Sequence, residues 1–126
     1  MRVESFGTSL GGIDIPILKI SNRNEDTEKF EENKPIIIII GRQHPGETYS
    51  SFIIHGFLNY ILSKHLICHK FRELFETWVI PIVNPDGVVA GNYRSNLQGK
   101  DMNRHFFADE DPEGYRNRAF EVEIIR

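Results

Sequence analysis

The sequence lacks the marks of secreted, membrane-spanning and nucleic-acid-binding proteins. It contains a single cysteine, Cys68, so no disulfide can form within the chain, and a reducing compartment is expected. No apolar run approaches the length of a membrane span, and the first ten residues, MRVESFGTSL, do not have the layout of a secretory signal. The formal net charge is -3 and no cluster of Lys or Arg is present. These absences predict a cytoplasmic protein that binds neither nucleic acid nor membrane.

What is present is the composition of one globular domain. Hydrophobic residues make up 40% of the 126 positions and charged residues 26%, as in folded rather than disordered proteins. A chain of this length can bury a core but holds at most one domain.

The order of the apolar patterns predicts an α/β fold with a mixed β-sheet flanked by helices. Five consecutive isoleucines, Ile36 to Ile40, have the β-branched character of a strand that is buried on both faces of a sheet. Two strands at 3–6 and 13–20 are expected to form a hairpin, and Pro16 favours an edge position for the second. The other expected elements are helices at 48–62 and 66–75, a strand at 78–83, a turn at 84–87 and a helix from 112.

His44 and Glu47 follow the isoleucine run, where the expected strand passes into the expected helix. Ligands of α/β proteins bind at the carboxyl edge of the sheet, so we expect the chemistry here. A spacing of three residues lets an imidazole nitrogen and a carboxylate oxygen meet one cation, and zinc accepts such ligands. The same spacing also arises by chance, and the alternative is a polar-loop histidine beside a carboxylate that favours the start of a helix.

Arg94, Asn103 and Arg104 form a second polar group in a stretch punctuated by glycine. The guanidinium fork matches a carboxylate, so this group is suited to bind an anion. An arginine near a metal can also stabilise an oxyanion during acyl transfer. The alternative is a surface loop with solvated arginines.

Three sequence blocks resemble, in the same order, those of the zinc metallocarboxypeptidases. The blocks are GRQHPGETYSS, IPIVNPDGVVAGNYR and LQGKDMNR, and they are most similar to the cytosolic carboxypeptidase branch, the Nna-like tubulin deglutamylases. The resemblance implies that His44 and Glu47 are ligands of Zn2+. It further implies that Arg94 polarises the scissile carbonyl, while Asn103 and Arg104 bind the terminal carboxylate of the substrate.

The resemblance also implies groups that we do not identify in this sequence. In that family the third zinc ligand is a histidine of a later block and the general base is a still later glutamate, which would both fall beyond Arg126. We therefore interpret residues 1–126 as a partial zinc carboxypeptidase catalytic domain that resembles the N-terminal half of the family's fold. As an isolated chain we expect it to be incomplete or inactive.

The function implied by the resemblance is zinc-dependent hydrolysis of C-terminal residues, with glutamates as the habit of this branch. The implied partners are polypeptide C-termini, including the acidic tails of tubulin. Two alternatives stay open: a non-catalytic truncated module that binds acidic peptide C-termini, and a fragment with no independent fold.

Overall fold

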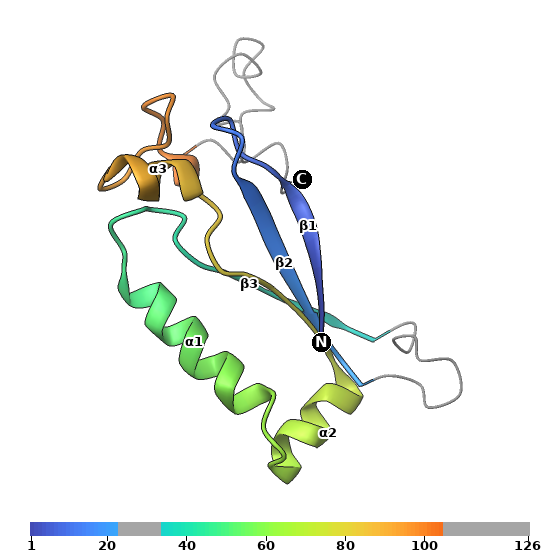
Figure 1. Ribbon diagram of the computed structural model, residues 1–126. Helices are drawn as coiled ribbons and strands as arrows, with labels where there is room; N and C mark the ends of the chain where they lie inside the picture. Colours follow the sequence, from blue (N-terminus) through green and yellow to red (C-terminus); the bar gives the residue numbers. More distant parts are fainter. Residues whose placement is uncertain (23–33, 105–126) are drawn as a thin grey trace.

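The computed structural model describes residues 1–22 and 34–104, which form a mixed four-stranded sheet with helices (Figure 1). The α/β class predicted from the sequence is confirmed. The predicted helix from 112 onward lies outside the described residues. In chain order the elements are β1 (Arg2–Thr8), β2 (Asp14–Ile20), β3 (Ile36–Ile40), α1 (Tyr49–Ile61), α2 (Leu66–Leu74), β4 (Glu76–Ile80), α3 (Pro85–Ala90) and a 3-10 turn (Met102–Arg104).

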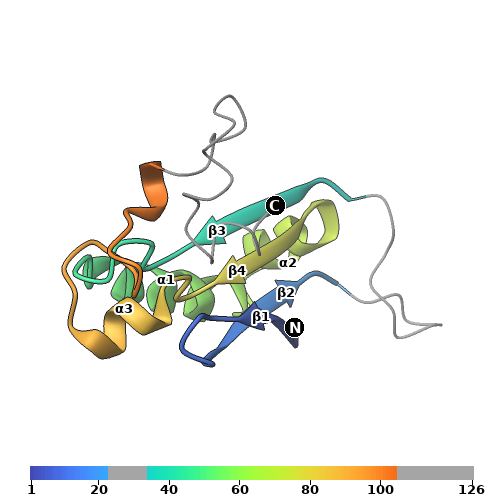
Figure 2. The same ribbon diagram turned by 90° about the horizontal axis from the view of Figure 1, so that it is seen from above.

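The strand order of the sheet is β1-β2-β4-β3. β1 and β2 form the predicted hairpin, β2 pairs with β4 in antiparallel fashion, and β3 pairs with β4 in parallel. The parallel pair is connected by α1 and α2, which lie on one face of the sheet (Figures 1 and 2). Because β3 and β4 run in the same direction, the segments that follow them start at the same edge of the sheet.

The sheet has a core on each face. Between the sheet and the helices, Ile20 and Val79 pack with side chains of α1 and with Cys68 of α2. On the opposite face Ile80 packs with Ile15 and Ile17 of β2, with Val83 and with Met102 of the 3-10 turn. The second core ties the end of the polar 91–104 stretch to the sheet.

The prediction that the isoleucine strand is buried on both faces is wrong. Ile36, Ile38 and Ile40 expose 49%, 57% and 40% of their surface. Within the described residues β3 is an edge strand, and these three side chains lie on the face opposite α1 and α2, where no described helix covers them. The β-branched run predicted the strand correctly, but it holds no information about which elements cover it.

The edge position predicted from Pro16 is also wrong, because β2 lies between β1 and β4. Its pairing with β4 covers only Leu18 to Ile20, so Pro16 lies outside that ladder. On the other side Pro16 lies opposite Ser5, where β1 has an irregularity between Ser5 and Gly7. Proline is tolerated at such irregularities since the missing N–H removes no ladder hydrogen bond.

The predicted turn at 84–87 is instead the start of a short helix, α3. The Asn84 side chain accepts a hydrogen bond from Gly87 N (3.0 Å), and Pro85 occupies the first turn. Gly91 ends the helix in a left-handed conformation with φ of 74°. An Asn-Pro sequence suits helix starts as well as turns, which explains the difference.

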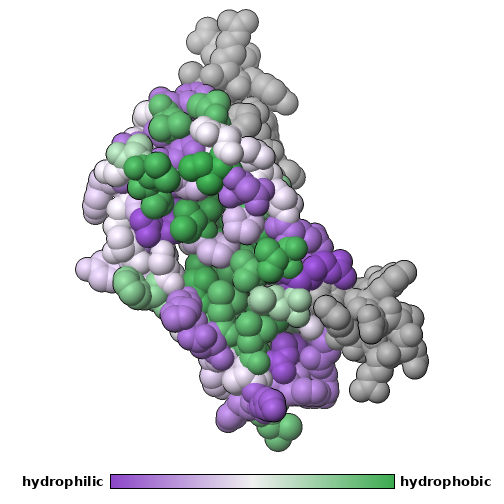
Figure 3. Space-filling model, viewed as in Figure 1, coloured by the Kyte–Doolittle hydropathy of each residue, from purple (hydrophilic) through white to green (hydrophobic). Residues whose placement is uncertain are grey.

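The outer surface of α1 is also apolar. Phe52 and Ile53 are 73% and 70% exposed, whereas Ile54 and Ile61 are buried. In the view of Figure 3, hydrophobic surface gathers in the middle of the face and again over α3. None of the helices in the described ranges is long and apolar enough to cross a membrane.

Neighbouring isoleucines of β3 and β4 offer a matched test of this packing. Ile80 is 1% exposed and Ile38 57% exposed. We expect Ile80→Ala to lower the free energy of unfolding by about 2–5 kcal/mol, and Ile38→Ala to change it by no more than about 0.5 kcal/mol. Urea unfolding of both variants measures this. Equal losses would show that the Ile38 face is covered.

Candidate functional site

The predicted metal pair lies in the turn that connects β3 to α1. Gly41 extends the parallel pairing beyond the strand, since its N–H donates to Ile80 O (2.9 Å) and its carbonyl accepts from Val83 N (3.0 Å). A Cβ at Gly41 would lie 2.5 Å from the Pro81 carbonyl oxygen, so the close approach of the two segments requires glycine. The turn therefore starts from a fixed position at the sheet edge.

His44 and Glu47 meet, as their spacing predicts. His44 Nδ1 and Glu47 Oε1 are 2.9 Å apart, and Glu47 N donates to the His44 carbonyl at 3.1 Å. His44 is 6% exposed, so its ring is held within the protein, whereas the Glu47 side chain is more than half exposed.

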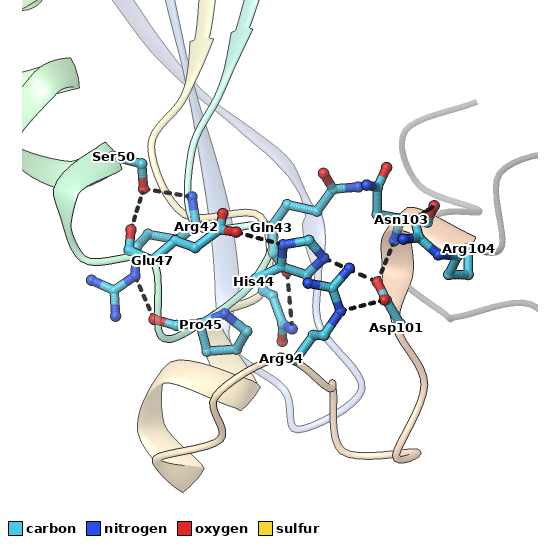
Figure 4. Close-up of polar contacts among 11 residues, drawn as sticks. Arg42, Gln43, His44, Pro45, Glu47, Ser50, Arg94, Asp101, Asn103 and Arg104 are labelled. Carbon is cyan, nitrogen blue, oxygen red and sulfur yellow. Dashed lines mark hydrogen bonds and ion pairs between the residues drawn. The ribbon is translucent and has the colours of Figure 1, made fainter.

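Asp101 is the central residue of the site, and sequence reasoning missed it. Its Oδ1 lies 3.0 Å from His44 Nε2, and its Oδ2 accepts from Arg94 Nε at 2.6 Å (Figure 4). Asn103 N donates to Oδ1 at 2.9 Å, and Arg104 N donates to the Asp101 carbonyl at 3.0 Å. One carboxylate thus brings both predicted groups together.

The electrostatics of Asp101 favour its ionised form. Burial raises the pKa of its carboxyl, but the hydrogen bonds from Arg94 and His44, together with a backbone N–H, outweigh burial and lower the pKa to about 2. Asp101 is therefore a carboxylate at neutral pH and only accepts hydrogen bonds.

The donor set around His44 suits a cation. A neutral imidazole has one N–H and can donate to only one of the two carboxylates that its nitrogens face; we assign this proton to Nε2, facing the ionised Asp101. Nδ1 then presents its lone pair to the Glu47 carboxylate, another acceptor, only 2.9 Å away. Two facing acceptors need a positive charge between them, either a second ring proton or a metal ion. A histidine whose other nitrogen is held by a carboxylate is a common metal-ligand arrangement.

His44 and Glu47 thus fit two ligand positions of a zinc site. Within residues 1–22 and 34–104 no group of three or more His, Cys, Asp or Glu side chains could hold a metal. The other described histidines have local partners: His55 contacts Asn59, His65 caps α2 and His69 pairs with Glu73. His105 lies outside the described residues.

The loop that carries Arg94 (residues 91–104, the arginine loop) is held by hydrogen bonds within it. It is also held by contacts with the turn that connects β3 to α1 (residues 41–48, the metal turn). Asn96, 1% exposed, accepts from the N–H groups of Gln98 and Lys100 through its amide oxygen. Gly46 N donates to Tyr93 O at 2.8 Å, which joins the metal turn to the residue before Arg94. A Cβ at Gly46 would lie 2.9 Å from that same carbonyl oxygen.

The side chains of Arg94 and Arg104, which are predicted to bind an anion, are held only in part by contacts with described residues. The Arg94 side chain is 43% exposed, and beyond its Nε its guanidinium makes no hydrogen bond to a described residue. Arg104 is exposed and donates from Nη1 to the Asn103 carbonyl at 3.2 Å. Their roles toward a substrate stay predictions.

Comparison with known proteins gives one family. The sequence profile described as zinc carboxypeptidase matches residues 1–121. Cytosolic carboxypeptidase 2 of Mus musculus is 42% identical over 105 residues, which cover 83% of this chain and 12% of that protein. Cytosolic carboxypeptidase 6 of Homo sapiens is 39% identical over 103 residues, 82% of this chain and 20% of that protein. The chain therefore spans less than a quarter of these relatives.

Solved structures share the fold. A putative carboxypeptidase from Burkholderia mallei has a TM-score of 0.80 and 26% identity, covering 99% of this chain and 30% of its own. A putative carboxypeptidase A from Shewanella denitrificans has a TM-score of 0.78 and 28% identity, covering 98% of this chain and 30% of its own.

Two glycines test the close contact between the turn and the arginine loop. We expect Gly46→Ala to lower the free energy of unfolding by about 1–3 kcal/mol, because its Cβ would overlap Tyr93. The control is Gly56→Ala in α1, where nothing lies within 4 Å of the added Cβ. That change should stabilise by about 0.5–1 kcal/mol. Thermal unfolding of both variants measures it, and a neutral Gly46→Ala would contradict the contact.

The Asp101 carboxylate can be titrated directly by carbon-13 NMR. In the metal-free protein we expect its pKa near 2, and Arg94→Ala should raise it because one hydrogen bond to the ionised form is lost. Since the folded pKa is lowered, the stabilisation by Asp101 is complete above about pH 3.9, the unfolded value, and is lost as the pH falls toward about 2. An unshifted Asp101 in the wild type would argue against the cluster.

Proposed function

The chain belongs to the zinc carboxypeptidase family, and we propose that it contributes the metal-binding turn and the arginine loop of a metallocarboxypeptidase site. The observation that carries the proposal is the shared Asp101 carboxylate, which contacts His44 on one oxygen and Arg94 on the other. A metal ligand and a cation for the substrate are thereby held side by side, as hydrolysis of a peptide bond at a metal requires.

In this proposal His44 and Glu47 hold Zn2+ through Nδ1 and a carboxylate oxygen. Bound zinc acts as a Lewis acid that polarises a carbonyl and lowers the pKa of a water molecule. Asp101 keeps the Nε2 proton of His44 and so leaves Nδ1 as the ligand atom. The third protein ligand and the general base remain to be supplied by residues beyond the described part of the chain.

Arg94 and the 103–104 pair act on the substrate. The exposed end of the Arg94 guanidinium donates to the carbonyl oxygen on which negative charge develops, while Nε stays on Asp101. Asn103 and Arg104 bind the terminal carboxylate and so restrict cleavage to the last peptide bond.

We propose polypeptide C-termini as substrates, with terminal glutamates and the acidic tails of tubulin as the preferred class. The support is the sequence similarity to proteins named cytosolic carboxypeptidases, and we propose a cytoplasmic location on the same ground. The cations of the 94–104 segment are compatible with acidic tails.

The second candidate is a non-catalytic module that binds acidic peptide C-termini. It is favoured by the presence of only two facing metal ligands among the described residues. Zinc content after dialysis separates the two: one tightly held ion per chain supports the enzyme, whereas peptide binding without zinc supports the module.

The site assignment predicts two different losses. In the full-length form, which includes the third ligand and the general base, His44→Ala should abolish zinc binding and hydrolysis together, because a ligand is removed. Arg104→Ala should leave zinc binding intact and weaken kcat/KM for peptides with a free C-terminal carboxylate by roughly 10–100-fold, the range for a lost hydrogen bond to a charged group. The matched control is Arg2→Ala, an exposed arginine of β1.

Peptides that end in glutamate, with a free or an amidated C-terminus, provide the measurement. Where a preparation shows no turnover, the same peptides are compared by dissociation constant. The ratio of kcat/KM, or of dissociation constants, between the free and the amidated peptide is compared in both proteins. If this ratio is the same in the Arg104→Ala variant as in the wild type, Arg104 does not bind the terminal carboxylate.

A further inference from the structure

Arg42 is the residue of the metal turn that the proposed function leaves without a role. It lies between Gly41 at the sheet edge and the His44–Glu47 pair, and it is the single non-glycine residue with positive φ (50°) in residues 1–22 and 34–104. A residue with a Cβ is disfavoured in this left-handed region. Such a conformation persists where surrounding contacts enforce it, and these positions cluster at functional sites.

The side-chain contacts of Arg42 connect the turn to the start of α1. Its Nε donates to the carbonyl of Pro45 at 2.8 Å, and its Nη1 donates to Ser51 Oγ at 3.1 Å. Pro45 lies between the two predicted ligands, and Ser51 is in the first turn of α1. Figure 4 shows the contact between the Arg42 guanidinium and the Pro45 carbonyl. Together with the bond to Ser51, it links the middle of the turn to the helix that follows.

A second path runs through the backbone of Arg42. Its N–H donates to Ser50 Oγ at 3.1 Å, and that hydroxyl donates to the carbonyl of Glu47 at 2.8 Å. One end of the turn is thereby connected to the backbone of the carboxylate ligand. Arg42 is in the left-handed conformation when it makes both sets of hydrogen bonds.

We propose that Arg42 is a positioning residue that fixes His44 and Glu47 relative to each other through Pro45 and Ser50. The proposal rests on the proposed function, in which the pair binds zinc. A direct role of Arg42 on the substrate is disfavoured, because Nε donates to the Pro45 carbonyl and Nη1 donates to Ser51 Oγ. Its fixed fork reaches two acceptors at once, which the single ammonium of lysine does not reproduce.

The test compares Arg42→Lys and Arg42→Gly with a matched arginine elsewhere. Arg42→Gly removes the guanidinium but permits the positive φ, so the backbone is not strained. The control is Arg72→Lys, since Arg72 Nη1 likewise donates to backbone carbonyls, those of Ile61 and Ser63, at the junction of α1 and α2. Thermal unfolding of each variant shows whether it is folded.

Amide hydrogen exchange measures how firmly the metal turn is held in the metal-free protein. The N–H groups of Glu47 and Thr48 donate to the carbonyls of His44 and Gly46 at 3.1 and 2.9 Å. Both Arg42 variants should accelerate exchange of these amides by about tenfold, the effect of losing one charge-assisted hydrogen bond, while β3–β4 amides keep the wild-type rate. Arg72→Lys should leave the turn amides unchanged.

Titration with Zn2+ alone, monitored through the NMR signals of the His44 ring, measures zinc affinity. Zinc affinity should fall by about 10–100-fold in Arg42→Lys and Arg42→Gly, the range for residues that orient metal ligands. It should stay at the wild-type value in Arg72→Lys. A purely structural role would lower the unfolding temperature but leave zinc affinity of the folded protein unchanged.

The outcomes are separable. Wild-type exchange and zinc affinity in Arg42→Lys overturn the proposal, as does an equal effect of Arg72→Lys. In a protein that includes the third ligand, zinc binding no better than that of His44→Ala refutes the metal site of the proposed function. The exchange rates of Glu47 and Thr48 then decide by themselves whether Arg42 holds the turn.

Discussion

The organisation of the site depends on the contacts of the Asp101 carboxylate with His44 and Arg94. Its two oxygens face His44 and Arg94, and its neighbouring backbone carries Asn103 and Arg104. A low pKa keeps this group charged, so it holds the His44 ring in one tautomer and the guanidinium in one direction. Without it, the metal turn and the arginine loop would lose the link from His44 to Arg94 and would keep the contact of Gly46 with Tyr93.

The fold delivers these groups to one place through the parallel pair β3–β4. The metal turn follows β3 and the α3–arginine segment follows β4, so both begin at the same edge of the sheet. Glycines at 41, 46 and 87 let the backbones approach where a Cβ would collide with Pro81, Tyr93 and Ser95 carbonyl oxygens. Met102 holds the 3-10 turn against the sheet, because its side chain is fully buried in the core that contains Ile80 and Val83.

Local chemistry was readable from the sequence and long-range chemistry was not. The isoleucine run predicted β3, and the three-residue spacing predicted that His44 and Glu47 meet, since both are properties of neighbours in the chain. Asp101 is 57 residues from His44, and no periodicity relates the two. The exposure of Ile38 likewise depends on which element lies over β3, which the strand itself does not encode.

The central claim is that the pair at the end of β3 is a metal site whose histidine is oriented by Asp101. Anomalous diffraction at the zinc edge, from crystals of the protein grown with zinc, tests it directly. The account predicts an anomalous peak between His44 Nδ1 and the Glu47 carboxylate, with His44 Nε2 still on Asp101 and Arg94 still on its other oxygen. A peak at another site, or zinc bound to Asp101 in place of His44, would contradict it.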